Sequence, residues 1–285
     1  ICSKGASTNL CGLTTVAARR YHVIPGEDYD ILASRAVAPS FYRAPHPEGM
    51  TPFEYQHAGV EYALARDHCL IGDAPGLGKS CQSILISNAI DAGPTLIVCP
   101  ASLRLNWERE VRMWSTIPRV STYPVLKAKD GVSLEANYVI ISYDLLRNAD
   151  ILAAILDCRW DHLVLDEAHY LKDPKGNNRT RAICAPDGLP SVVGRITMAS
   201  GTILPNQPIE CYNAIRLLDW EAIDNASLDT FRENYYALGS GMVRSPVQKR
   251  DANGNSYTVS EVHFSNSVRN VPTNLADLQF RLRKN

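Results

Sequence analysis

The pattern of hydrophobic and polar residues divides the chain into three stretches. In the middle stretch, from Pro52 to about Leu218, short apolar runs alternate with segments in which apolar residues recur three or four positions apart. Short apolar runs are typical of strands buried on both faces, and the wider spacing indicates helices. The predicted strands are Cys69–Ile71, Thr95–Cys99, Tyr138–Ile141, His162–Leu165 and Ile196–Ala199. The predicted helices are Gly78–Ile90, Leu103–Trp114, Asp144–Leu156 and Pro208–Leu218.

This alternation of strands and helices predicts an α/β domain. Right-handed crossovers place such strands side by side in a parallel sheet, and the connecting helices cover both faces, so we expect three layers around a parallel central sheet. Ligands of such sheets bind beyond the carboxyl ends of the strands. Candidate chemistry is therefore expected in the loops that follow the predicted strands.

The flanking stretches are less regular. Residues 1–50 have mixed polarity and a proline-rich end, so we interpret them as an N-terminal extension before a domain at residues 51–222. Residues 223–285 are predicted to form a helical and hairpin segment that is irregular in part. Its predicted elements are a helix at Leu228–Leu238, an irregular Gly- and Asn-rich stretch at Gly239–Asn255, an edge strand or hairpin arm at Tyr257–Phe264 and a helix at Asn274–Leu282.

Composition narrows the class of protein. The 285 residues are 45% apolar and 21% charged, which is ordinary for a globular protein. With 29 basic and 30 acidic residues the net charge is −1, so any contact with nucleic acid must be local. The eight cysteines include no Cys-x-x-Cys pair, and no apolar run approaches the roughly 18 residues that cross a bilayer. We therefore expect an intracellular, soluble protein with no membrane partner.

The sharpest motif follows the first predicted strand. Its sequence is Asp73-Ala-Pro-Gly-Leu-Gly-Lys-Ser80, and it opens the first predicted helix, which is the context of a phosphate-binding loop. Gly76 and Gly78 allow a tight turn whose N–H groups surround phosphate oxygens. Lys79 would reach the β- and γ-phosphates of ATP, and Ser80 would hold Mg²⁺. Asp73 replaces the first glycine of the general pattern, so a plain glycine-rich turn is the alternative interpretation.

A second motif ends the fourth predicted strand. It reads His162-Leu-Val-Leu-Asp-Glu-Ala-His169, an apolar strand that finishes in two adjacent carboxylates. Asp166 at such a strand end can coordinate Mg²⁺, and Glu167 can polarise the attacking water. An isolated Asp-Glu pair is more often a solvated helix start, but its place after a phosphate loop favours the catalytic interpretation.

The two motifs resemble motifs I and II of helicase superfamily 2, and Leu171-Lys172 after the second is similar to the Swi/Snf form. Further segments agree in order along residues 50 to 220. They are Phe53–Gln56 as a glutamine motif, Cys99–Leu103 with Asn106–Glu108 as motif Ia, Ile141–Asp144 as motif Ib and Ser200–Thr202 as motif III.

This resemblance implies a RecA-like P-loop lobe and a set of roles. Gln56 would read adenine, although a surface glutamine on an amphipathic helix is the alternative. The nucleotide-contacting residues implied are Gln56, Pro75, Gly76, Leu77, Gly78, Lys79, Ser80 and Cys81. Lys79, Asp166 and Glu167 would be catalytic, with Ser80 and Asp166 on Mg²⁺. His169, Ser200 and Thr202 would couple the ATP site to DNA. Ser102, Ser142 and Lys172 would contact DNA.

The chain departs from the family pattern at several positions. Ala74-Pro75 stands where motif I usually has Glu-Met, Ile203 replaces the proline after the motif III threonine, and Asp173 follows Lys172 where Asn is usual. Family members close a second RecA-like lobe, which carries arginine fingers, over the ATP. These 285 residues contain no second phosphate loop and no motif V or VI. We therefore expect the chain alone to hydrolyse ATP very poorly.

The resemblance implies an ATPase that translocates on double-stranded DNA without sequence preference. Two alternatives stay open at this point. A strand-separating helicase on DNA or RNA shares the Asp-Glu-Ala-His motif, and the single lobe with its unusual Ala74-Pro75 would also suit a nucleotide-responsive binding module that never turns over ATP.

Overall fold

A six-stranded sheet forms the centre of the molecule. The computed structural model describes residues 41–173, 178–201, 208–250 and 256–272. All strands of the central sheet run parallel, in the order β1-β6-β5-β2-β4-β3. This confirms the predicted three-layer α/β fold. The strands are β1 His68–Ile71, β2 Thr95–Cys99, β3 Thr122–Pro124, β4 Tyr138–Ser142, β5 Trp160–Asp166 and β6 Val193–Ala199.

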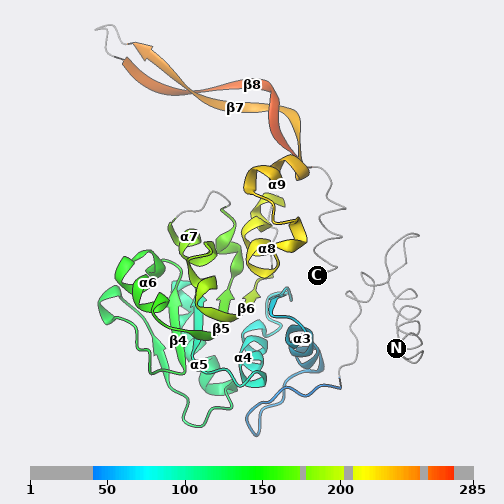
Figure 1. The fold of residues 1–285 in the computed structure, drawn as a ribbon, viewed down its shortest axis with the longest axis vertical. Coiled ribbons are helices and arrows are strands. Elements are labelled where there is room, and N and C mark those ends of the chain that lie inside the picture. The colour runs from blue at the N-terminus through cyan, green and yellow to red at the C-terminus, as the bar shows by residue number, and fades with distance from the viewer. Residues whose placement is uncertain (1–40, 174–177, 202–207, 251–255, 273–285) are drawn as a thin grey trace, which may run out of the picture.

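Helices cover both faces of this sheet (Figure 1). The five residues of strand β2 are apolar or small because helices pack against both of its faces. Leu96 and Val98 pack with residues of α6, α7 and α8 on one face, and Ile97 and Cys99 pack with α4 and α5 on the other. Both faces are therefore buried, as a parallel sheet requires. The helices are α3 Glu54–Leu64, α4 Lys79–Ala89, α5 Arg104–Trp114, α6 Ala149–Leu156, α7 Asn178–Cys184 and α8 Tyr212–Leu218.

All five predicted strands are present, and two of the predicted helices begin later than expected. The predicted helix Asp144–Leu156 is a 3-10 turn at Leu145–Arg147 followed by α6, because the Asn148 side chain caps α6 by accepting the Ile151 N–H at 3.0 Å. A 3-10 turn likewise precedes α8. Strand β3 was not predicted, because three residues at a sheet edge, one of them proline, carry no periodic signal.

The C-terminal stretch is more regular than its sequence indicates. Helix α9, Leu228–Tyr235, ends before the predicted Leu238, and strands β7 (Tyr236–Arg250) and β8 (Ser256–Pro272) form a long antiparallel hairpin that projects from the body. The expectation of an irregular stretch from Gly239 is therefore wrong as far as Arg250, because cross-strand pairing overrides weak local strand propensity. The predicted arm Tyr257–Phe264 is confirmed within β8.

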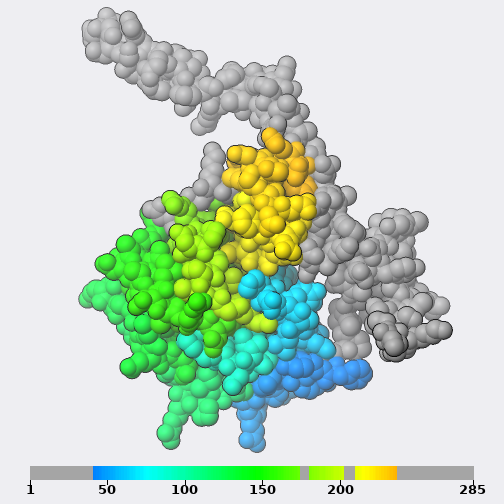
Figure 2. All heavy atoms as spheres, in the orientation of Figure 1, coloured from blue at the N-terminus to red at the C-terminus, as the bar shows by residue number. Residues whose placement is uncertain are grey.

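Two sequence predictions fall outside the described residues, namely the helix Asn274–Leu282 and most of the N-terminal extension. Figure 2 shows α8 and α9 packed together at one end of the α/β body. Their contact is an apolar cluster that includes Tyr212, Ile215 and Phe231. None of the helices in the described ranges is long and apolar enough to span a bilayer.

A buried histidine links three elements that lead to the predicted site. His162 of β5 is fully buried. Its Nδ1 lies 2.8 Å from Ser87 Oγ of α4, and its Nε2 lies 2.8 Å from Thr197 Oγ1 of β6. Burial, with a smaller contribution from the Arg195 charge, lowers the pKa of His162 to about 3. The imidazole therefore stays neutral and bridges the two hydroxyl groups.

His162 should make the fold sensitive to mild acid. Above pH 6.5 the side chain is neutral in both folded and unfolded chains. As the pH falls from about 6.5 towards 3, His162 becomes protonated in the unfolded chain but not in the folded chain. The free energy of unfolding should therefore drop by up to about 1.4 kcal/mol per pH unit. Chemical denaturation at a series of pH values measures this slope.

His162→Gln is the matched variant, because its amide keeps a donor and an acceptor but does not titrate. We expect this variant to be less stable than wild type at pH 7.5. Below pH 6.5 its free energy of unfolding should depend less steeply on pH, by the contribution of one proton. Parallel stability curves for the two chains would show that His162 is not the group that titrates.

Candidate functional site

The predicted motifs converge because the strands that carry them are parallel and in register. Ile71 at the end of β1 pairs with Ala199 at the end of β6, and Ala199 pairs with Asp166 at the end of β5. Cys99 and Ser142 pair in the same way at the ends of β2 and β4. The loops that follow these strands, which contain the segments resembling motifs I, Ia, Ib, II and III, therefore lie along one edge of the sheet.

The loop after β1 has the backbone that a phosphate-binding loop needs. Gly76 and Gly78 have φ values of 87° and 74°, in the left-handed region that favours glycine. Gly78 is the N-cap of α4 and has no side chain that could accept hydrogen bonds from the first N–H groups of this helix. The Lys79 ammonium donates to the carbonyl oxygens of Asp73 at 2.9 Å and Ala74 at 3.3 Å. The loop thus curves around its own lysine.

The departure at Asp73 is explained by its contacts. Asp73 is not among the residues with positive φ, so its position does not require glycine. Its carboxylate accepts a hydrogen bond of 2.7 Å from Gln82 Nε2 in α4. The aspartate therefore ties the start of the loop to the helix that the loop opens.

Gln56 is part of the loop's support. Its side chain is 5% exposed, so the alternative of a surface glutamine is wrong. Its Oε1 accepts from the Phe53 N–H at 2.9 Å, and its Nε2 donates to the Leu77 carbonyl at 3.3 Å. The Tyr55 hydroxyl, which was not predicted from the sequence, donates to the same carbonyl at 3.2 Å. Helix α3 is thereby joined to the phosphate loop at two points.

Asp166 lies at the tip of β5 and is 7% exposed. Its Oδ2 accepts from Trp107 Nε1 at 2.8 Å, and its Oδ1 accepts from the Glu167 N–H at 2.9 Å. Burial raises the pKa of Asp166 and the Glu167 charge adds to this, whereas the two hydrogen bonds and the Lys79 charge oppose it. The positive charge of Lys79 in the phosphate loop therefore acts on the Asp166 carboxylate and favours its ionised form.

The arrangement suits a magnesium ion. Hard oxygen ligands are available from the Asp166 carboxylate at the strand tip and from the Ser80 hydroxyl in the first turn of α4. A carboxylate offers about four acceptor positions, and the hydrogen bonds from Trp107 and from the Glu167 N–H use two of those of Asp166. An ion at this point would also offset the cost of burying the Asp166 charge.

Glu167 leaves the strand in a left-handed conformation, with φ of 51°. Its Oε2 lies 3.0 Å from His169 Nδ1, so these two predicted site residues are brought together. Positive φ is uncommon for a residue other than glycine and marks a backbone that its surroundings hold in place. The side chain is about one third exposed, which leaves it accessible to a substrate water.

The loop after β6 packs against the phosphate loop. The Ser200 N–H donates to the Ile71 carbonyl at 3.2 Å, and Ser200 itself is buried. A Cβ atom on Gly201 would lie 3.1 Å from Pro75 Cδ, so the two loops touch where Pro75 departs from the family pattern. Thr202 lies outside the described residues.

The residues predicted to contact DNA differ in exposure. Ser102, in the turn before α5, and Lys172, after the Asp-Glu-Ala-His motif, are exposed. Ser142 is 3% exposed at the end of β4. Their roles stay predictions.

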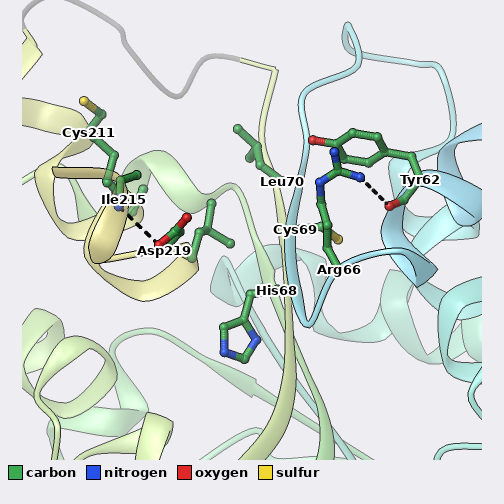
Figure 3. A pocket seen from close by; sticks show the side chains of 11 residues that line it. Tyr62, Arg66, His68, Cys69, Leu70, Cys211, Ile215 and Asp219 are labelled. Atoms are coloured by element: carbon green, nitrogen blue, oxygen red, sulfur yellow. Dashed lines mark hydrogen bonds between the residues drawn. The ribbon is translucent and has the colours of Figure 1, made fainter. Parts of the chain in front are cut away.

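A cavity of about 190 Å³ lies elsewhere, between the end of α3, the edge strand β1 and α8 (Figure 3). Its lining includes Leu70, Ile215 and Arg66, and the Arg66 guanidinium lies 3.7 Å from the centroid of the Tyr62 ring. No residue of the predicted site lines it. We therefore place the candidate site at the strand ends rather than in this cavity.

Known proteins resemble this chain in sequence and in fold. A family model described as the SNF2-related domain matches residues 55–251. A Caenorhabditis elegans homolog of SWI/SNF-related matrix-associated actin-dependent regulator of chromatin subfamily A-like protein 1 is 35% identical over 180 residues, which are 61% of this chain and 25% of that protein. Switch 2 of Arabidopsis thaliana is 29% identical over 212 residues, 64% of this chain and 23% of that protein. The chain thus spans about a quarter of these relatives.

Among solved structures, the Sulfolobus solfataricus SWI2/SNF2 ATPase core in complex with dsDNA is similar, with a TM-score of 0.56 and 21% identity. The match covers 68% of this chain and 41% of that one. At this identity the likeness concerns the fold.

The glycine at the start of α4 provides a test of the loop geometry. A Cβ atom at Gly78 would lie 2.4 Å from Gln56 Nε2, and its φ is positive. Gly78→Ala should therefore displace the Gln56 amide and weaken binding of a fluorescent ATP analogue, in addition to the roughly 1–2 kcal/mol cost of the left-handed backbone. Gly49→Ala is the control, because Gly49 also has a positive φ, of 83°, but a Cβ atom there would meet no atom within 4 Å. Equal nucleotide affinity of the two variants would contradict the assignment.

Proposed function

Because this chain belongs to the SNF2-related domain family, we propose that it is the ATP-binding lobe of an ATPase that translocates on double-stranded DNA. The observation that carries the proposal is the nearness of two motifs at the carboxyl ends of the strands. The loop around Lys79 follows β1, and Asp166 ends β5, with only the end of β6 between them. An ammonium and a buried carboxylate at the same end of the sheet suit a magnesium-bound triphosphate.

ATP binding is assigned to the loop and its support. The N–H groups of Gly76 and of residues 78–81 would surround the phosphate oxygens, and Lys79 would exchange the carbonyls of Asp73 and Ala74 for phosphate oxygens of higher negative charge. Gln56 would orient the adenine while its position is held by α3. Bound Mg²⁺ would neutralise charge on the phosphates, with Ser80 and Asp166 as its protein ligands.

Glu167 is proposed to accept hydrogen bonds from the attacking water and to orient it. The His169 ring lies beside this carboxylate, with its Nδ1 3.0 Å from Glu167 Oε2 but without the geometry of a hydrogen bond. Ser200 lies in the loop that contacts the phosphate loop. We propose that it relates the state of the ATP site to the DNA-facing segments, together with His169 and Thr202. These roles follow from the family resemblance and the packing of the loops.

DNA contact is proposed at Ser102 in the segment after β2, at Ser142 at the end of β4 and at Lys172 in the segment after β5. The overall charge of −1 gives no long-range attraction to DNA, so local contacts to phosphates must supply the affinity. Backbone contacts of this kind position a protein on a duplex without reading its sequence. Sequence-independent binding is what a translocating enzyme requires.

Turnover is proposed to need a second RecA-like lobe of the same protein. Arginine fingers contribute about 10³–10⁵ to the rate in related phosphoryl-transfer enzymes. We therefore expect this chain by itself to bind ATP and to hydrolyse it slower by about that factor than a two-lobed protein.

Lys79→Ala tests nucleotide binding. Loss of a charge-assisted hydrogen bond should weaken binding of a fluorescent ATP analogue about 10- to 100-fold, while the melting temperature stays near that of wild type. Lys129→Ala, at an exposed turn, is the matched control and should bind normally. An unfolded Lys79→Ala chain would indicate that the lysine is structural.

Translocation is tested with the complete protein. We expect ATP turnover stimulated by duplex DNA, abolished by Glu167→Gln, and coupled to displacement of the third strand of a triplex. Strand displacement from a duplex should be weak, which separates a translocase from a strand-separating helicase. Turnover that is indifferent to DNA of any form would refute the proposal, and turnover that is absent altogether would favour a binding module.

A further inference from the structure

The orientation of Asp166 is set largely by residues outside its own strand. Trp107 of α5 donates its indole N–H to the carboxylate at 2.8 Å, and the Tyr143 hydroxyl, just after β4, donates to the Asp166 main-chain carbonyl at 2.7 Å. Both rings are 1% exposed, so water does not compete for these hydrogen bonds. One donor holds the side chain of Asp166 and the other holds its backbone.

Both donors come from segments to which DNA contact was assigned. Trp107 lies one turn after Ser102 and Leu103, in the helix that follows β2. Tyr143 follows Ser142 at the end of β4. The two segments are also joined directly, because the Tyr143 N–H donates to the Cys99 carbonyl at 3.3 Å.

Tyr143 also contacts the chain after Asp166. Its ring stacks on Tyr170, with centroids 5.1 Å apart and planes 6° from parallel. Tyr170 belongs to the 3-10 turn Ala168–Leu171, which directly follows Glu167. Tyr143 therefore contacts both Asp166 and the turn that follows Glu167.

Need for a hydrogen-bond acceptor does not by itself explain the Trp107 contact. A buried indole N–H requires an acceptor. Trp160, equally buried, meets that requirement with the main-chain carbonyl of Ile155 at 3.0 Å. Trp107 instead donates to the Asp166 carboxylate, to which the proposed function assigns the metal. Removing a hydrogen-bond partner that orients a metal ligand typically lowers metal affinity about 10- to 100-fold.

We propose that Trp107 and Tyr143 form a clamp that positions Asp166 for the metal and links that position to the DNA-facing segments. This rests on the proposed function and adds to it a route between its two sites. A movement of α5 or of the turn after β4 on DNA changes the direction of the Asp166 carboxylate. DNA contact thereby changes how strongly the site holds metal with nucleotide.

The test measures metal demand rather than turnover. A fluorescent ATP analogue is titrated with the chain over a range of Mg²⁺ concentrations, starting in EDTA. Trp107→Phe removes the N–H and keeps an aromatic ring, so the half-saturating Mg²⁺ concentration should rise about 10-fold. Tyr143→Phe removes only a hydroxyl group, is expected to fold, and should raise it by a smaller factor.

Trp160→Phe is the matched control. It removes a buried indole N–H from the same protein and should lower the melting temperature, but its Mg²⁺ curve should coincide with that of wild type. If the curves of Trp107→Phe and Tyr143→Phe also coincide with wild type, the clamp is refuted, since a purely structural role alters stability alone.

Two further readings separate the parts of the proposal. A short DNA duplex should shift the Mg²⁺ curve of the wild-type chain, and Trp107→Phe should abolish that shift; an equal shift in both chains overturns the link to DNA. Nucleotide affinity in EDTA depends on Lys79 and reports the proposed function by itself. If Lys79→Ala retained that affinity, the nucleotide assignment would fail, whereas the Trp107 comparison would still be judged from its own metal curves.

Discussion

The parallel pairing of β1, β6 and β5 is the constraint on which the candidate site depends. In a parallel sheet every strand presents its carboxyl end at the same edge, and the register sets how closely those ends align. Here Ile71, Ala199 and Asp166 form one row across three strands. Segments that are about ninety residues apart in the chain therefore meet, and the order of the strands decides which loops touch. Burial on both faces requires the apolar sequences of these strands. The parallel sheet therefore produces both the hydrophobic core and the alignment of the site residues.

Burial of charge accounts for much of the detail around that edge. Asp166 is a carboxylate in a place where few waters reach it, and desolvation alone would favour its neutral form. Hydrogen bonds from Trp107 and from the Glu167 N–H, together with the Lys79 charge, stabilise the ionised form against this cost. A divalent cation would add to the same balance. The same reasoning explains His162, which remains neutral between two hydroxyl groups because burial lowers its pKa and the Arg195 charge lowers it further.

The departures from the family pattern are accommodated by local contacts. Asp73 occupies a position whose backbone does not need glycine and uses its side chain to bind Gln82. Pro75 packs beside Gly201, where a larger residue would crowd it. These substitutions change how the phosphate loop is supported while its two left-handed glycines are kept. They are therefore compatible with nucleotide binding, and their effect is expected on the contact between the two loops.

The sequence by itself determined the strands, the parallel α/β fold and the identity of the motif residues, because apolar runs, glycine at left-handed positions and acidic strand ends are local signals. It did not reveal β3, the start of α6 or the length of the β7–β8 hairpin, where pairing and capping by distant residues outweigh local propensity. Only the tertiary structure decided that Gln56 is buried against Leu77, and that Trp107 and Tyr143 hold Asp166. A hydrogen bond between residues 59 positions apart has no signature in the chain, because it is created by the sheet that brings them together.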